Sequence, residues 1–160
     1  MKALLVIDMQ QDYIGEMRNK KRYTYEVGTL IDHVNARITN FQQNGNLIIY
    51  ILNKKITKAH GEVISEIDKR VKMASPIMFD KNKSSCFSNS EFAGFLRLKR
   101  VSEIECVGVD GNFCVAQTAL SAIQAGYTVI FPCSCIGVMN QVRFTKTKQR
   151  LSQKGIKVIE

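Results

Sequence analysis

The sequence is poor in proline and has no long apolar run. Only two prolines occur among 160 residues, so nothing resembles the proline-rich linkers that separate domains. No apolar stretch approaches the roughly 18 residues that a membrane-spanning helix needs, which argues against a membrane protein. With 45% hydrophobic residues, the chain has enough apolar surface for a single core. We therefore expect one domain over residues 1–160.

Histidine is also scarce, and cysteine does not follow the pattern of a disulfide framework. The five cysteines are odd in number and scattered, and Cys133 and Cys135 have the spacing C-x-C instead of the C-x-x-C of zinc and redox sites. The chain has only two histidines, so a metal site is not expected. Met1 leads directly into an apolar segment without room for a signal peptide, and reduced cysteines suit the cytoplasm. We therefore expect a cytoplasmic protein.

The net charge of +9 invites a nucleic-acid interpretation. The basic residues, however, are spread over five segments: 19–22, 54–58, 97–100, 143–150 and 154–157. The sequence has neither a recognition-helix motif nor a row of aromatic residues for base stacking. We expect a solvated basic surface, with no nucleic acid and no membrane as partner. An anionic substrate remains open, because charge alone does not decide it.

Short runs of branched apolar residues alternate with segments of helical periodicity. We expect strands at 3–7, 47–52, 77–79, 104–109, 127–131 and 156–159, and helices at 26–44, 62–71, 88–98, 112–125 and 140–154. This alternation is typical of a parallel sheet with helices on both faces. We predict an α/β protein, a three-layer α/β/α Rossmann-like sandwich with six parallel strands in the order 3-2-1-4-5-6. The glycine-rich dinucleotide fingerprint is missing after the first strand, so a nucleotide-dependent dehydrogenase is not expected.

Three reactive side chains follow strands whose carboxyl ends share one edge of that sheet. Asp8 follows the first strand, Lys81 the third, and Cys114 lies in the first turn of the helix after the fourth. Each has an ordinary interpretation: a turn cap, a solvated charge and a buried apolar thiol. Together they form a workable covalent catalyst, because the ammonium and the helix dipole favour a thiolate and the carboxylate can carry its proton.

Three sequence motifs contain or adjoin these residues. They are LLVIDMQQDY at 4–13, the K-x-x-x-S-x-F spacing of Lys81, Ser85 and Phe87, and GVDGNFCV at 108–115 with AGY at 125–127. In this order they resemble the isochorismatase-like cysteine hydrolases, the superfamily that includes nicotinamidases and N-carbamoylsarcosine amidohydrolases. The resemblance covers residues 3 to about 137. It implies a triad of Asp8, Lys81 and Cys114 that cleaves the C–N bond of a small amide or carbamoyl compound through a thioester on Cys114.

The resemblance also implies the shape of the backbone beside Cys114. It suggests a cis peptide bond between Val109 and Asp110, with the N–H groups of Asp110 and Cys114 forming an oxyanion hole. Three aromatic residues near the motifs are expected to line the substrate pocket, although such residues are as often part of a core: Tyr13, Phe87 and Phe113. Family members are commonly dimers or tetramers, so we expect a homo-oligomer that takes a small-molecule substrate.

Two departures from the family pattern bear on activity. Gly111 stands where threonine is usual, which removes a supporting hydrogen bond. The nicotinamidase metal motif, an aspartate and histidines after the second strand, would fall in residues 53–60, where only His60 is available. We therefore expect no metal and no cofactor, and nicotinamide is a poor candidate substrate. One alternative stays open: a non-catalytic protein of the same fold that binds a metabolite or a partner and keeps Cys114 as a redox-sensitive thiol.

Overall fold

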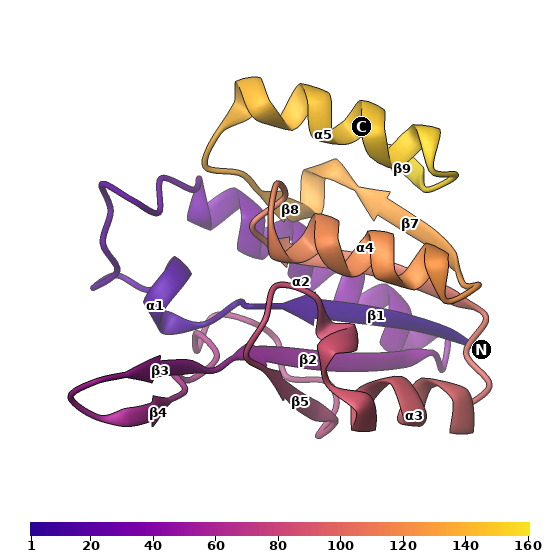
Figure 1. The fold of residues 1–160 in the computed structure, drawn as a ribbon, viewed down its shortest axis with the longest axis horizontal. Helices are drawn as coiled ribbons and strands as arrows, with labels where there is room; N and C mark the ends of the chain where they lie inside the picture. The colour runs from indigo at the N-terminus through magenta and orange to yellow at the C-terminus, as the bar shows by residue number, and fades with distance from the viewer.

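The computed structural model describes residues 1–160 and places a parallel sheet between two layers of helices (Figure 1). The main sheet has the order β5-β2-β1-β6-β7-β9, and the two-residue strand β8, Ile136–Gly137, pairs with β6. Its six principal strands are β1 Lys2–Ile7, β2 Leu47–Asn53, β5 Met78–Lys81, β6 Glu103–Val109, β7 Thr128–Pro132 and β9 Lys157–Ile159. The predicted three-layer fold and its strand order are confirmed.

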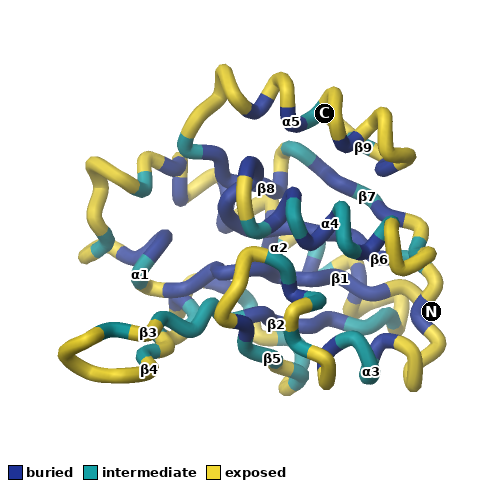
Figure 2. The backbone as a smooth tube through the Cα atoms, viewed as in Figure 1, coloured by how far each residue is buried: buried dark blue, intermediate teal, exposed yellow.

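The central strand β1 explains why the sheet is covered on both faces. Alternate side chains of a strand point to opposite faces, and here every residue from Ala3 to Ile7 is buried (Figure 2). Ala3, Leu5 and Ile7 join the core shared with α3 and α4, whereas Leu4 and Val6 join the core beneath α2. A continuous apolar run is therefore the pattern that this strand needs.

Of the five helices, four begin and end close to their predicted positions, and the short first helix was not predicted. These five helices are α1 Gln11–Ile14, α2 Val27–Gln43, α3 Ser90–Leu98, α4 Cys114–Gln124 and α5 Gln141–Gln153, with short 3₁₀ turns η1 Cys86–Ser88 and η2 Cys133–Cys135. Asn89 and Asn140 cap α3 and α5, because their side chains accept hydrogen bonds from backbone N–H groups of the first turn. None of the helices combines the length and apolarity that a membrane crossing requires.

The predicted helix at 62–71 is wrong. Residues in this part of the chain form an antiparallel hairpin of β3, Lys55–Thr57, and β4, Gly61–Val63, followed by an irregular segment. The backbone of that segment bonds to the start of the chain: Gln11 N–H donates to the carbonyl of Glu66, and Asp68 N–H donates to the carbonyl of Met9. These bonds replace the intrahelical ones that a helix would have made.

Strands β1 and β6 approach each other closely where their carboxyl ends meet. Gly108 of β6 has φ +117°, and a Cβ atom built there would lie 2.1 Å from the carbonyl oxygen of Ile7. Only glycine fits such a contact. The next residue along β1 is Asp8, so this close approach brings the end of β6 against the first of the predicted site residues.

Candidate active site

The structure brings Asp8, Lys81 and Cys114 together at the carboxyl edge of the sheet. Lys81 is the last residue of β5, and its Nζ atom lies 3.0 Å from Oδ2 of Asp8 and 3.3 Å from Sγ of Cys114. The side chain of Lys81 is 0% exposed and that of Asp8 is 4% exposed. An ammonium, a carboxylate and a thiol therefore share a site that is largely shielded from water, where electrostatic interactions are strong.

Asn53 is a fourth member of this cluster, which the sequence analysis missed. Its Oδ1 atom accepts a hydrogen bond from Lys81 Nζ at 3.3 Å, and its Nδ2 group donates to the Tyr13 hydroxyl at 2.7 Å. The side chain of Gln10 bonds both the N–H and the carbonyl of Asn53 and so fixes the end of β2. Asn53 could have been predicted as a site residue from the sequence, because it ends a strand at the same edge of the sheet as Asp8 and Lys81.

Burial decides the protonation state of the thiol. Burial and the nearby Asp8 carboxylate raise the pKa of Cys114 to about 12, although Lys81 opposes this shift. Burial also raises the pKa of Asp8 above its ordinary value, again opposed by Lys81. For Lys81, burial lowers the pKa, but Asp8 and Cys114 outweigh it and the net shift is upward. The Cys114 thiol is therefore protonated at rest and needs a base, and the contact of Lys81 with Asp8 at 3.0 Å favours the ionised carboxylate.

The backbone between β6 and α4 leads directly to Cys114 and includes N–H groups without a partner in the helix. The peptide bond between Val109 and Asp110 is cis. Cys114 is the first residue of α4, where N–H groups have no partner within the helix, and the N–H of Asp110 donates none of the backbone hydrogen bonds outside the strands and helices.

The side chain of Asp110 folds back onto the protein. It accepts hydrogen bonds from the N–H groups of Asn112 and Met139, both at 2.7 Å, and from the hydroxyl of Tyr25 at 3.4 Å. Burial raises the pKa of Asp110, and these donors oppose the shift. Its carboxylate is therefore occupied in holding the loop after β6 against residues 25 and 139.

A pocket of about 300 Å³ opens onto this cluster. It is lined by Asp8, Tyr13, Arg22, Tyr23, Tyr25, Asn53, Lys55, Val109, Asp110, Phe113, Cys114 and Met139. The expected wall residues Tyr13 and Phe113 are among them. The expectation for Phe87 is wrong: it packs in the core with its ring centre 5.3 Å from that of Phe92 and 6.0 Å from that of Tyr127. Its motif neighbour Ser85 caps η1.

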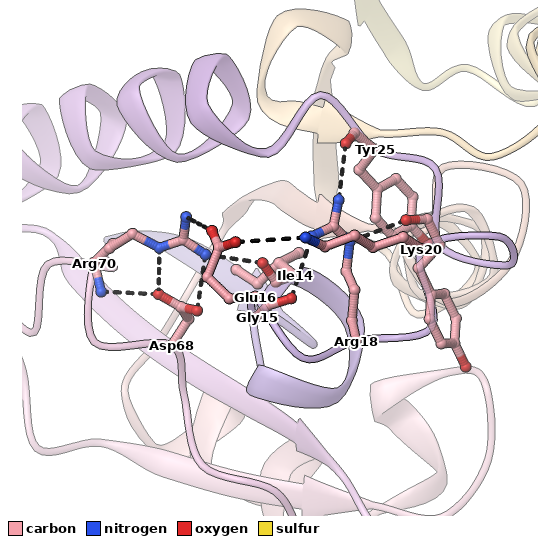
Figure 3. A network of polar contacts seen from close by, with 9 residues as sticks. Ile14, Gly15, Glu16, Arg18, Lys20, Tyr25, Asp68 and Arg70 are labelled. Carbon is pink, nitrogen blue, oxygen red and sulfur yellow. Dashed lines mark hydrogen bonds and ion pairs between the residues drawn. The ribbon is translucent and has the colours of Figure 1, made fainter.

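Three of the lining residues lie on the loop between α1 and α2, which is held in shape by Arg18 (Figure 3). The guanidinium of Arg18 donates to the backbone carbonyls of Gly15, Tyr23 and Tyr25. Arg70 ties the neighbouring segment to the same region, because it donates to the carbonyl of Ile14 and pairs with Asp68. The pocket wall formed by residues 22–25 therefore depends on side chains that do not line the pocket.

This arrangement of motifs and fold can be compared with known proteins. The family model of the isochorismatase domain matches residues 2–160. The chain belongs to the isochorismatase family. The resemblance drawn from the three sequence motifs is therefore confirmed. A comparison with curated proteins finds no match.

Solved structures share the isochorismatase-family fold with this chain at low sequence identity. A pyrazinamidase of Pyrococcus horikoshii in complex with zinc has a TM-score of 0.80 and 21% identity, over 99% of this chain and 98% of that one. An isochorismatase family protein from Desulfovibrio vulgaris has a TM-score of 0.87 and 17% identity, over 99% and 93%. A nicotinamidase from Staphylococcus aureus has a TM-score of 0.77 and 22% identity, over 99% and 97%.

The glycine that replaces the family threonine has a structural reason in this isochorismatase-family chain. A Cβ atom at Gly111 would lie 2.8 Å from a methyl carbon of Ile136, 2.8 Å from the ring of Phe144 and 2.9 Å from a methyl carbon of Val138. Larger neighbours thus fill the space that a side chain at this position would need. The turn is held without it, because Gly111 N–H donates to the carbonyl of Gly137 at 2.9 Å.

The residues after β2 do not fit a resident metal. Residues 53–60 would have to supply the metal ligands. Within them, Asn53 bonds Lys81 and Tyr13, Lys55 is a cation on the pocket wall, and His60 is exposed at the tip of the hairpin. No group of three or more His, Cys, Asp or Glu side chains in the structure could hold a metal ion. The reaction proposed below therefore has no step that passes through one.

Proposed function

We propose that this protein is a cysteine hydrolase that cleaves the C–N bond of a small amide or carbamoyl compound. The observation that carries the proposal is the contact of Lys81 Nζ with both Asp8 and Cys114, at the floor of a pocket large enough for a small molecule. Membership of the isochorismatase family supports it. In this proposal Cys114 is the nucleophile, Asp8 the acid and base, and Lys81 the electrostatic partner of both.

The first half of the reaction forms an acyl-enzyme. Sγ of Cys114 attacks the substrate carbonyl carbon while its proton passes to Asp8, whose Oδ1 atom accepts no hydrogen bond from the protein. The carbonyl oxygen becomes negative and is stabilised by the N–H groups of Asp110 and Cys114. Asp8 then gives the proton to the leaving nitrogen, the C–N bond breaks, and ammonia or an amine departs. A thioester remains on Cys114.

The second half releases the acid with the same groups. Asp8 takes a proton from a water molecule, and the oxygen of that water attacks the thioester carbonyl. The second tetrahedral intermediate collapses, the C–S bond breaks, and Asp8 returns its proton to the sulfur. Lys81 keeps its positive charge throughout, because its pKa is raised by Asp8 and Cys114 against the effect of burial. It thereby favours the anionic forms of both neighbours.

The alternative of a redox-sensitive thiol is less well supported by this site. Redox-sensor cysteines are exposed and have a low pKa, whereas the pKa of Cys114 is raised to about 12 by burial and Asp8. Such a thiol reacts slowly with oxidants at neutral pH. It reacts with a bound carbonyl only when a base is in place to remove the proton, and Asp8 is that base in the proposed mechanism.

Turnover of a panel of small amides and ureido compounds, followed by ammonia release, tests the proposal. We expect Cys114→Ala to abolish turnover and a Cys114 thioester to be seen by mass spectrometry in the wild-type protein during turnover. Cys133→Ala, which changes a second partly exposed thiol outside the pocket, is the matched control and should retain activity. Turnover that survives in Cys114→Ala would contradict the proposed nucleophile.

A further inference from the structure

The pocket carries two cationic side chains that the proposed chemistry does not use, Arg22 and Lys55. Arg22 lies on the loop between α1 and α2 and is exposed. Its guanidinium lies over the ring of Tyr23, 5.3 Å from the ring centre, and makes no salt bridge or side-chain hydrogen bond within the protein. All five of its N–H donors are therefore available to a ligand.

Lys55 reaches the same pocket from the hairpin on the other side. Its Nζ atom lies 3.3 Å from Oδ2 of Asp12 and 4.9 Å from the ring centre of Tyr13. The hydroxyl of Tyr13 accepts a hydrogen bond from Asn53, which in turn contacts Lys81. A short series of contacts thus connects Lys55, through Tyr13 and Asn53, to the Lys81 ammonium that touches the Cys114 sulfur.

The acidic residues that line the pocket, Asp8 and Asp110, form no salt bridge with these cations. Asp8 is paired with Lys81, and the carboxylate of Asp110 already accepts three hydrogen bonds from Tyr25, Asn112 and Met139. Asp12 is the one anionic partner of Lys55, and its side chain is 42% exposed, so solvent weakens that pair. Around the opening, Arg143 adds a further cation 4.6 Å from the ring centre of Phe113.

We propose that the substrate carries a carboxylate, which Arg22 and Lys55 bind while the scissile amide lies against Cys114. This inference rests on the proposed hydrolase function and names its substrate class: a small amide or carbamoyl compound that is also an acid. A planar guanidinium matches a carboxylate with two parallel hydrogen bonds, and an ammonium adds a point charge. The rings of Tyr13, Tyr23 and Phe113 line the space between the two ends.

Two alkylating reagents test the proposed anion site, formed by Arg22 and Lys55, without any turnover. N-Iodoacetyl-β-alanine and N-propyl iodoacetamide deliver the same carbon to a thiolate and have the same chain length, but only the first carries a carboxylate at its far end. The ratio of their rates at Cys114, measured by mass spectrometry at pH 9, cancels the thiolate fraction because both reagents meet the same thiolate. We expect this ratio to fall about tenfold in Arg22→Gln and in Lys55→Gln, the effect of losing one charge-assisted hydrogen bond.

A variant with the same charge change elsewhere controls for net charge. Lys146 is exposed on α5 and makes no salt bridge or side-chain hydrogen bond, so Lys146→Gln should leave the ratio unchanged. A ratio that stays constant in Arg22→Gln and Lys55→Gln overturns the inference. An equal fall in Lys146→Gln also overturns it, because the effect then belongs to the whole molecule. The rate of the neutral N-propyl iodoacetamide in each variant shows that the site remains folded.

Turnover then separates this inference from the function on which it rests. Succinamate and butanamide have the same chain length and the same primary amide, and differ in one carboxylate. We expect the kcat/KM of succinamate to exceed that of butanamide and to fall about tenfold in Arg22→Gln. Equal turnover of the two amides, unaffected by Arg22→Gln, overturns the carboxylate inference but leaves the hydrolase intact. A fall in the alkylation ratio without turnover of any amide contradicts the hydrolase and supports the anion site.

Discussion

At the scale of single residues, the thiol of Cys114 lies between a cation that lowers its pKa and an anion that raises it. Burial is the largest influence and is joined by Asp8, so the pKa rises to about 12 despite Lys81. A thiol with this pKa is almost entirely protonated at neutral pH. Its alkylation by iodoacetamide should therefore keep rising about tenfold per pH unit between pH 7 and 9, where an ordinary cysteine begins to level off.

The two neighbours of Cys114 should have opposite effects when removed. Lys81→Met removes the cation, so the pKa of Cys114 should rise further and alkylation at a given pH should slow. Asp8→Asn removes the anion, so the pKa should fall and alkylation should be at least as fast. Turnover of Asp8→Asn should nevertheless drop by about 10²–10⁴, because the acid and base are lost. Alkylation rates against pH, measured beside kcat, test both effects, and wild-type turnover in Asp8→Asn would contradict the role of Asp8.

Gly111 is constrained by the space around it, and not by an unusual φ angle. Because a Cβ atom would come within 3.0 Å of three side chains, Gly111→Ala should lower the free energy of unfolding by about 1–3 kcal/mol. Gly94→Ala is the matched control, since its Cβ would meet only the end of Arg97 at 3.8 Å. In the middle of α3 that change should stabilise by about 0.5–1 kcal/mol. Urea unfolding measures both, and equal effects would contradict the argument.

At the scale of elements, the regular part of the fold followed from local pattern. The strands β1, β2 and β6 are buried on both faces and appear in the sequence as continuous apolar runs, and α2 has an uninterrupted apolar stripe. Because parallel strands end at one edge, the predicted strand order was also sufficient to predict that Asp8, Lys81 and Cys114 lie close together. Local pattern was sufficient to predict these elements because the faces that each one buries determine the apolar pattern of its own residues.

The hairpin and the segment after it could not be predicted in the same way. Val63, Ile64, Ile67 and Val71 have helical spacing, but the backbone around them bonds to residues 9–11 instead of to itself. Gln10 adds side-chain bonds to Ser65 and Asn53. These partners lie more than 40 residues away in the chain, so no local window contains them. Lys55 and Arg22 were missed as pocket residues for the same reason.

The loop between α1 and α2 depends on one side chain. Arg18→Met keeps much of the length but removes three hydrogen bonds to the carbonyls of Gly15, Tyr23 and Tyr25. We expect faster amide hydrogen exchange in residues 16–25 and unchanged exchange in β1 and β6, since loops open independently of the core. Arg97→Met, on the exposed end of α3, is the control. Unchanged exchange in the loop of Arg18→Met would show that the loop is held by other contacts.

At the scale of the whole molecule, we expect the buried ion pair of Asp8 and Lys81 to lower the stability of the fold. Asp8 and Lys81 are buried, and Oδ1 of Asp8 has no hydrogen-bond partner. Taking two charges out of water often costs more than their attraction returns, and an unsatisfied buried polar atom costs about 1–3 kcal/mol more.

A double-mutant cycle across this pair should expose that cost. Asp8→Asn or Lys81→Met alone leaves one buried charge without its partner and should lower the free energy of unfolding by about 3–5 kcal/mol. The double variant removes both charges and should be as stable as the wild type, or more stable by about 1–4 kcal/mol. Urea unfolding at pH 7 measures all four proteins. A double variant clearly less stable than the wild type would mean that the ion pair contributes net stability, and strictly additive losses would mean that the two charges do not interact.

The pH dependence of the same variants identifies the charge responsible. In Lys81→Met the cation that opposed the effect of burial is gone, so the folded-state pKa of Asp8 should lie further above its unfolded value. A raised carboxyl pKa means that stability is fully present below the unfolded pKa, about 4, and is lost as pH rises through the folded pKa. In the double variant residue 8 does not titrate. The difference in unfolding free energy between Lys81→Met and the double variant should therefore be small near pH 4 and grow toward pH 7. The Lys81→Met change is common to both proteins, so a difference that does not change with pH would assign the cost to the packing or hydrogen bonding of the residue 8 side chain instead of to the charge of the buried carboxylate.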